Sequence, residues 1–167
     1  MDFRVMQGDI AVQSADILVT AANTSLRMKS GVAGALKRAA GSGLPKEAAS
    51  KGPIGLGEVA ATDAYDLDAE WVIHAAALPE GGKATAVSIR EATRNTLELA
   101  DELNAESLIM PALGCGIAGF DLDKGGRIIA EEIRDFESES LTDVALIEYS
   151  GEDYQVLQRV AETTDGA

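Results

Sequence analysis

Short hydrophobic runs alternate along this chain with longer segments in which hydrophobic residues recur at every third or fourth position. The run at residues 17–19 is apolar enough to be a strand buried on both faces of a sheet. In residues 85–104, Ile89, Ala92 and Thr96 have the spacing of one buried helical face. The same pattern predicts strands over residues 3–6, 16–21, 57–64, 70–75, 107–110 and 143–149, and helices over residues 32–40, 45–50, 85–104, 122–136 and 152–162.

Strands that alternate with helices predict a sheet that helices cover on both faces. The expected fold class is therefore α/β, a three-layer α/β/α sandwich with a mixed central sheet. A length of 167 residues is typical of one domain, which usually takes about 100–200 residues. The sequence has no internal repeat, linker or low-complexity segment, so we expect residues 1–167 to form a single domain.

Two glycine-bearing loops each join a predicted strand to a predicted helix. The first passes through a polar turn at residues 23–25 and reaches a helix that begins near Gly31. The second contains Gly114, Gly116 and Gly119. Backbone N–H groups at a helix N-terminus bind anions, so two such loops at one side of a sheet predict a cleft for a phosphorylated ligand.

The second loop also matches the pattern G-x-G-x-x-G, which is weak evidence in a chain with 17 glycines. A tight structural turn explains it equally well. A dinucleotide-binding fold normally carries this pattern after its first strand, whereas here it lies late in the chain. The position therefore disfavours a nicotinamide-dependent dehydrogenase.

The charge of the chain excludes one class of partner. Acidic residues outnumber basic residues by 28 to 14, which gives a net charge of −14. General binding to nucleic acid needs clustered Lys and Arg, so this composition argues against it. An acidic surface is also typical of a halophilic cytoplasm. We expect phosphates to be held by backbone N–H groups and helix dipoles rather than by Lys or Arg.

One cysteine and one histidine limit the covalent and metal chemistry of the chain. They cannot form a structural zinc site, and we expect neither a metal nor a cofactor. Cys115 and His74 have no third group to orient them, so we reject a Cys–His hydrolase and expect His74 to be structural. The sequence has no signal peptide and no apolar run near the ~18 residues that span a bilayer, which predicts a cytoplasmic protein without a membrane partner.

Five segments carry a family resemblance, and they follow in order across almost the whole chain. They are GDI at 8–10, VTAAN at 19–23, SGVAGALKRAAG at 30–41, WVIHAA at 71–76 and MPALGCGIAGF at 110–120. Together they resemble the successive motifs of the macro domain family. Macro domains bind ADP-ribose, and some hydrolyse it from modified proteins or deacetylate O-acetyl-ADP-ribose.

The resemblance implies roles for individual residues. Asp9 falls at the adenine amino group with the Ile10 backbone beside the ring, and Tyr149 falls where family members stack a ring on adenine. Asn23 falls at the distal ribose and is the candidate catalytic residue. The loops that would hold the two phosphates contain Ser30, Gly31, Val32, Gly114, Cys115, Gly116, Ile117 and Ala118.

Structural roles stay open for three of these residues. Asp9 is also a common turn or cap residue, and Asn23 also suits a left-handed turn. Tyr149 at a strand end also suits packing at the sheet edge.

The sequence also departs from the family pattern. Many hydrolytic members have an Asp that positions or activates water where this chain has Ala33, and many members have a second Asn at Thr20. The usual glycine run is Lys29-Ser30-Gly31, and Ala118 replaces an aromatic residue. The resemblance implies hydrolysis of ADP-ribosyl esters, with ADP-ribose, its esters and mono-ADP-ribosylated proteins as partners. The alternative is a non-catalytic reader of ADP-ribose, which Ala33 favours because it supplies no general base.

Overall fold

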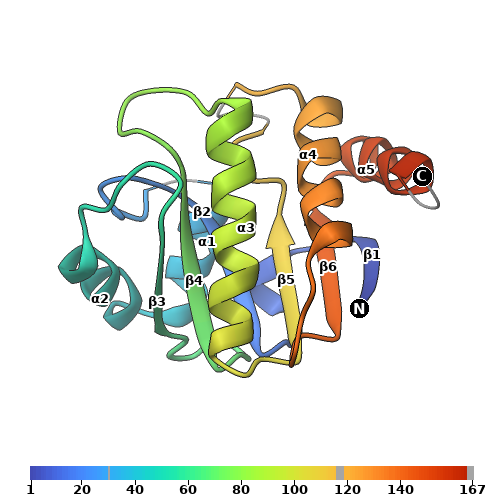
Figure 1. The fold of residues 1–167 in the computed structure, drawn as a ribbon. Coiled ribbons are helices and arrows are strands. Elements are labelled where there is room, and N and C mark those ends of the chain that lie inside the picture. Colours follow the sequence, from blue (N-terminus) through green and yellow to red (C-terminus); the bar gives the residue numbers. More distant parts are fainter. Residues whose placement is uncertain (30, 116–118, 165–167) are drawn as a thin grey trace.

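The computed structural model describes residues 1–29, 31–115 and 119–164. Within them, six strands form one sheet in the order β1-β6-β5-β2-β4-β3 (Figure 1). Only β3 runs antiparallel to its neighbour, β4, and the other paired strands are parallel. The bounds are β1 (Asp2–Gln7), β2 (Ile17–Asn23), β3 (Val59–Asp63), β4 (Trp71–Leu78), β5 (Ser107–Pro111) and β6 (Asp143–Glu148). This arrangement confirms the predicted mixed sheet.

Helices cover both faces of the sheet, which confirms the three-layer sandwich. One face packs against α1 (Gly31–Ala40) and α2 (Gly43–Lys51) through a cluster that includes Leu36 and Leu44. The other face packs against α3 (Ala86–Glu102), α4 (Leu122–Asp135) and α5 (Gly151–Thr164). In the view of Figure 1, α3 and α4 lie in front of the sheet. None of the helices in the described part of the chain is long and apolar enough to cross a membrane.

The two central strands supply residues to both cores. In β2, Ile17 and Val19 pack on the side of α3, whereas Leu18 packs on the side of α1. All three side chains are fully buried, and burial of one such side chain is worth about 1.5–3 kcal/mol. The continuous apolar run predicted a strand buried on both faces, and the structure confirms it.

Side chains define where the longer helices begin. Thr85 and Ser88 form a reciprocal capping box at the start of α3, and the Asp121 side chain accepts a hydrogen bond from the Lys124 N–H at the start of α4. At the other end of α1, Gly41 has a φ of +95°, a left-handed conformation that favours glycine and ends the helix.

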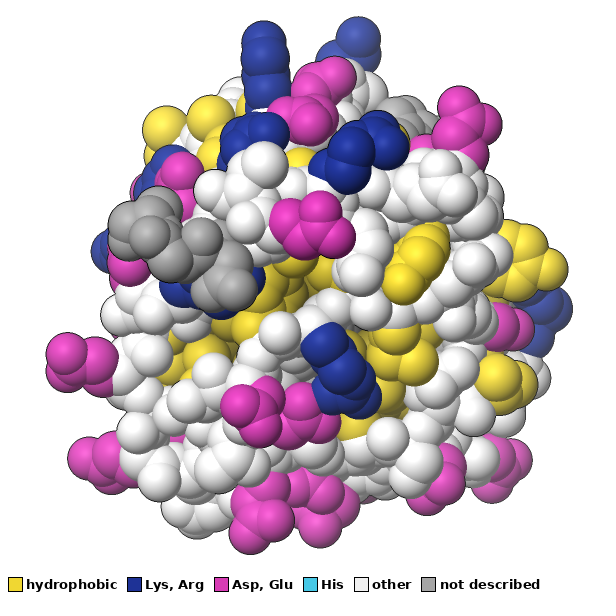
Figure 2. Space-filling view, turned by 90° about the vertical axis from the view of Figure 1, so that its right-hand side faces the viewer, with side chains coloured by type: hydrophobic (Ala, Val, Ile, Leu, Met, Phe, Trp, Pro, Cys, Tyr) yellow, Lys and Arg dark blue, Asp and Glu magenta, His cyan; other side chains and the backbone are white. Residues whose placement is uncertain are grey.

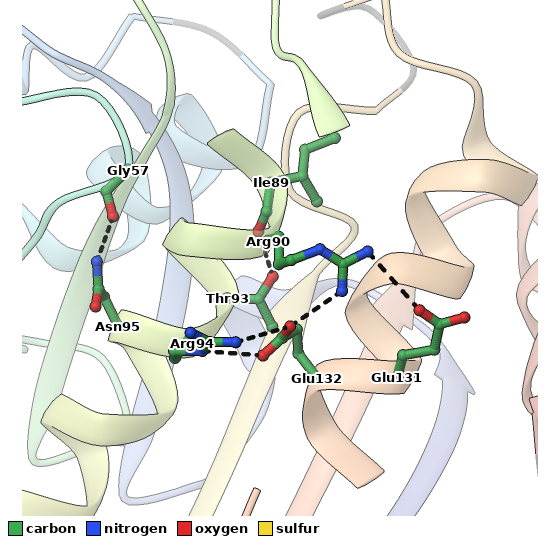
Figure 3. A network of polar contacts seen from close by, with 8 residues as sticks. All are labelled: Gly57, Ile89, Arg90, Thr93, Arg94, Asn95, Glu131 and Glu132. Atoms are coloured by element: carbon green, nitrogen blue, oxygen red, sulfur yellow. Dashed lines mark hydrogen bonds and ion pairs between the residues drawn. The ribbon is translucent and has the colours of Figure 1, made fainter. Parts of the chain in front are cut away.

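An ion-pair network joins α3 to α4 on the outer surface (Figure 3). The Glu132 carboxylate is buried and accepts hydrogen bonds from Arg90 Nη1 at 3.1 Å and from Arg94 Nε at 3.3 Å. Arg90 also pairs with Glu131. Further along α3, Asn95 Nδ2 donates to the Gly57 carbonyl at 2.8 Å and holds the helix against the loop before β3.

The structure corrects several predicted boundaries. The strand predicted over 70–75 continues to Leu78, because Ala76 and Ala77 are also buried. The second helix begins at Gly43 rather than Pro45, since proline is tolerated in a first turn. A short 3₁₀-helix that the sequence did not predict, η1 (Ile10–Val12), follows β1.

Candidate functional site

A cavity of about 1020 Å³ opens at the carboxyl ends of the parallel strands. This is the end toward which the β5 arrow points in Figure 1. Its walls come from the ends of β2, β4, β5 and β6, from the loop after β1 and from the first turns of α1. Ligands of open α/β sheets bind outside the carboxyl ends of the strands, and the volume is at the upper end of the range for small-molecule sites.

Most of the residues predicted to bind a ligand meet at this cavity. The described members of that set that line it are Asp9, Ile10, Asn23, Gly31, Val32, Gly114, Cys115 and Tyr149. The other predicted residues, Ser30, Gly116, Ile117 and Ala118, lie outside the described residues. Both glycine-bearing loops therefore line the same cavity, as the sequence predicted.

Asp9 both caps a short helix and lines the cavity. Its Oδ1 accepts a hydrogen bond from the Ala11 N–H at 2.9 Å and caps η1. Its backbone carbonyl accepts a hydrogen bond from Gln13 Nε2 at 3.1 Å. The cap fixes the carboxylate beside the cavity, and a carboxylate that uses one oxygen in this way still has a second oxygen that can accept.

Asn23 is the last residue of β2 and lies where the register with β4 shifts. Its Oδ1 accepts hydrogen bonds from the Ser25 N–H at 2.9 Å and from Ser25 Oγ at 2.5 Å. The side chain is half-buried and lines the cavity. Asn23 therefore takes part in a turn and lines the cavity at the same time.

Gly114 is required by the close approach of two segments. Its φ is +74°, and a Cβ at this position would lie 2.5 Å from the Ala84 Cβ, which is a clash. Gly31 also has a positive φ, +64°, and begins α1 at the cavity. Because the first N–H groups of a helix have no partner within the helix, this end of α1 presents donors toward an anion.

The environment of Cys115 argues against a thiolate nucleophile. Burial, and then the negative charges of Glu148 and Asp121, raise the pKa of the thiol to about 12. His74 does not line the cavity: it is fully buried in β4 and its Nε2 shares a hydrogen bond with Thr62 Oγ1 at 2.9 Å. These positions support the rejection of a Cys–His hydrolase.

Tyr149 follows β6 at the mouth of the cavity. Its side chain is 77% exposed, and its backbone carbonyl accepts a hydrogen bond from Gln7 Nε2 at 3.4 Å. A ring that is anchored through the backbone and exposed on the cavity side can stack on a planar ligand.

The sequence prediction missed the basic side chains of the cavity. Arg27, Lys29, Arg38 and Lys83 line it, against three carboxylates among the described lining residues, although acidic residues outnumber basic ones by 28 to 14 in the chain. In Figure 2, dark-blue Lys and Arg side chains are more frequent in the upper half of the face than along its lower edge, while magenta Asp and Glu side chains occur in both. That backbone groups hold phosphates without Lys or Arg stays a prediction, but basic side chains do lie in the cavity wall.

Glu148, at the end of β6, was also missed. Burial and the nearby charge of Asp153 raise its pKa to about 7, although a backbone hydrogen bond from Tyr149 opposes them. Both carboxyl groups line the cavity. Residues 1–29, 31–115 and 119–164 contain no group of three His, Cys, Asp or Glu side chains that could hold a metal ion.

Comparison with known sequences identifies the family. The sequence profile of the Macro domain family matches residues 19–129. A protein of Aquifex aeolicus is 35% identical over 161 residues, which cover 96% of this chain and 98% of that protein. A protein of Mycobacterium tuberculosis is 42% identical over 134 residues, which cover 80% of this chain but only 37% of that protein. The chain thus spans less than half the length of its mycobacterial relative.

Solved structures share the fold. A mutant Oceanobacillus iheyensis macrodomain with ADP-ribose matches with a TM-score of 0.85 and 25% identity, covering 96% of this chain and 91% of that one. The Trypanosoma brucei macrodomain in complex with ADP-ribose matches with a TM-score of 0.85 and 26% identity, covering 93% of this chain and 67% of that one. Because the family profile covers more than half of the chain and the likeness extends through the whole sandwich, the chain belongs to the macro domain family.

Proposed function

We propose that the cavity binds ADP-ribose and that the chain hydrolyses ADP-ribosyl esters, either on mono-ADP-ribosylated proteins or as O-acetyl-ADP-ribose. The observation that carries this proposal is the meeting of Asp9, Asn23, Gly31 and Gly114 around one cavity of about 1020 Å³. Two solved macrodomains of the same fold hold ADP-ribose, which supports the ligand class.

The adenine would lie at the β1–β6 side of the cavity. There the second carboxylate oxygen of Asp9 would accept a hydrogen bond from the adenine amino group, with the buried Ile10 beside the ring. The exposed ring of Tyr149 would stack on the base, a contact that also covers apolar surface.

The diphosphate would lie between the start of α1 and the loop that contains Gly114. Backbone N–H groups would bind its oxygens, and Arg27, Lys29 and Lys83 would attract it from the cavity walls. This local positive charge matters because a net charge of −14 otherwise repels an anionic ligand. The clustering of cations at the cavity therefore supports an anionic ligand.

Asn23 would orient the distal ribose at the β2–β4 side. A water held by the ligand's own phosphate and by main-chain groups attacks the acyl carbon, the bond from that carbon to the ribose oxygen breaks, and the ribose oxygen takes up the proton. In the alternative attack on the anomeric carbon, the bond from that carbon to the carboxylate oxygen breaks, the carboxylate leaves with the electron pair, and the proton of the water passes to the departing carboxylate or to solvent. Positioning and electrostatic stabilisation supply most of the acceleration, because no strong base is assigned to the water.

A non-catalytic ADP-ribose reader is the second candidate, and one observation favours it. Ala33 lies in the cavity wall, where its methyl group cannot accept a proton. The carboxylates among the described lining residues are Asp9 in the loop after β1, Glu148 in β6 and Asp153 in α5, while Asn23 ends β2. β5 separates β6 from β2, so the two strands are roughly 10 Å apart.

The experiment that separates the two is release of ADP-ribose from a protein that carries glutamate-linked mono-ADP-ribose. It uses wild type and Asn23→Ala in high salt, and it also records how much modified protein stays bound. We expect release by wild type and a loss of at least tenfold in Asn23→Ala, because the distal ribose is no longer oriented.

Each other outcome has a definite meaning. Retention without release makes the chain a reader, as the absence of a general base at Ala33 would predict. Equal release by both proteins removes the catalytic role of Asn23. Neither release nor retention contradicts the proposed ligand, and stabilisation by NAD but not by ADP-ribose in a thermal-shift assay would instead indicate a nucleotide-dependent oxidoreductase.

A further inference from the structure

The side-chain oxygen of Asn23 is held by two donors from one neighbour. The Ser25 N–H donates to Asn23 Oδ1 at 2.9 Å, and Ser25 Oγ donates to the same oxygen at 2.5 Å. A backbone N–H can only donate, so the Asn23 atom that faces it must be the oxygen and not the amide nitrogen. This contact therefore decides which way round the Asn23 amide is placed.

The Ser25 hydroxyl is itself oriented by the next residues. The Arg27 N–H donates to Ser25 Oγ at 3.3 Å, so the oxygen serves as acceptor on that side and its own hydrogen is directed to Asn23. The result is a chain of hydrogen bonds from Arg27 through Ser25 to Asn23, in which each bond polarises the next. Arg27 in turn belongs to the cavity wall.

The backbone of this turn is anchored in the core. The Leu26 N–H donates to the Asn23 carbonyl at 3.1 Å, and the Leu26 side chain is only 1% exposed. Leu26 has a φ of +58°, which is unfavourable for a bulky residue and persists only where its surroundings impose it. The buried side chain thus keeps Ser25 at a fixed place relative to the end of β2.

The amide nitrogen of Asn23 is consequently the part of the side chain that the turn leaves free. Among the described residues, Nδ2 has no hydrogen-bond partner, and Asn23 lines the cavity. We propose that Ser25 is a positioning residue that turns the N–H donors of Asn23 toward the cavity, so that Asn23 binds a ligand oxygen as a donor. This inference rests on the proposed function, in which that oxygen belongs to the distal ribose.

A turn-forming role alone predicts something different. The Ser25 N–H bond to Asn23 survives replacement of the side chain, so Ser25→Ala removes one of the two donors and leaves the other. The turn should therefore still form, with the amide less firmly held. If Ser25 positions Asn23, Ser25→Ala should therefore weaken the binding only of a ligand that contacts Asn23.

The test compares ADP-ribose with ADP, which lacks the distal ribose, by titration calorimetry. We expect Ser25→Ala to weaken ADP-ribose binding about fivefold, the range of one hydrogen bond, and to leave ADP binding unchanged. Ser25→Thr keeps the hydroxyl and should restore ADP-ribose affinity. Asn23→Asp keeps the acceptor for Ser25 but has no donor for the ligand, so it should weaken ADP-ribose binding at least tenfold.

Two results would overturn the inference while the proposed function stands. One is equal weakening of ADP and ADP-ribose by Ser25→Ala, which would make Ser25 a purely structural residue. The other is wild-type affinity in Asn23→Asp, which would mean that no donor from Asn23 is used. A wild type that binds neither nucleotide would overturn the proposed function itself, and the inference with it.

A second measurement needs no ligand. The side-chain amide signals of Asn23 in a nitrogen-15 NMR spectrum report how rigidly the group is held. We expect a high order parameter in wild type and in Ser25→Thr, and a lower one in Ser25→Ala. Identical rigidity in all three proteins would contradict the positioning role.

Discussion

Two partly buried carboxyl groups at opposite ends of the sheet have pKa values that are shifted in opposite directions. Asp101 lies at the amino end of the strands, where α3 leads toward β5. Burial alone would raise its pKa, but hydrogen bonds from Ser140, Leu141 and Glu139 outweigh it and lower the pKa to about 2. Glu148, at the carboxyl end, has a pKa raised to about 7 by burial and by Asp153.

The two ends of the sheet differ in whether carboxylates accept hydrogen bonds from the backbone N–H groups of the loops. At the amino end, carboxylates take them up: Asp101 binds the backbone of residues 139–141, and Asp16 Oδ2 accepts from the Glu106 N–H at 2.8 Å. At the carboxyl end, the start of α1 and the amide of Asn23 face a cavity. Loops at one end hold the fold together, and loops at the other end present polar groups to the cavity.

The largest effect that this comparison predicts is on stability. Asp101→Ala leaves three backbone N–H groups without their charged acceptor, so we expect it to lower the free energy of unfolding by about 3 kcal/mol. Binding of ADP-ribose by the folded protein should not change. Urea denaturation and calorimetry measure the two quantities.

The matched control is Glu98→Ala on the same helix, an exposed residue that should change stability by less than about 0.5 kcal/mol. If Asp101→Ala instead weakened ADP-ribose binding at unchanged stability, that would contradict the structural role assigned to the amino end of the strands.

The second effect is a dependence of stability on pH that comes from the cavity end. The folded-state pKa of Glu148 is raised from 4.5 to about 7, so the folded protein binds more protons than the unfolded chain between these values. Its contribution is present below pH 4.5 and is lost as pH rises through about 7, an effect of about 2 kcal/mol for a partly buried group. Denaturation at several pH values should show this loss in wild type and not in Glu148→Gln.

Asp101 makes stability depend on pH in the opposite direction, and it does so over a separate, lower pH range. Its folded-state pKa lies below the ordinary value of 3.8, so its contribution is present above pH 3.8 and is lost as pH falls toward 2. An Asp153→Asn variant tests the cause assigned to the Glu148 pKa shift. Removal of the Asp153 charge should move the pH-dependent loss of stability that comes from Glu148 to lower pH. A transition that stays in place would contradict the assigned cause.

The positions of Asp9 and Asn23 at the cavity could be predicted because the segments GDI and VTAAN, which contain them, resemble macro domain motifs. The layers could be predicted because periodicity alone decides which residues are buried. The raised pKa of Glu148 could not be predicted, since its largest cause is burial, which depends on how distant segments pack in the folded chain. The basic residues of the cavity were hidden for the same reason: they are dispersed in a sequence whose overall charge is negative.

The smallest effect concerns those basic residues. Lys83→Gln should weaken ADP-ribose binding about threefold at low salt, because an exposed charge is worth about 0.2–1 kcal/mol, and the difference should vanish in high salt. Lys46→Gln on α2 changes the net charge by the same amount at an exposed position outside the cavity wall. If both variants weaken binding equally, the ligand responds to the total charge of the chain. If only Lys83→Gln does, the carboxyl end of the sheet attracts the anion locally, against a net charge of −14.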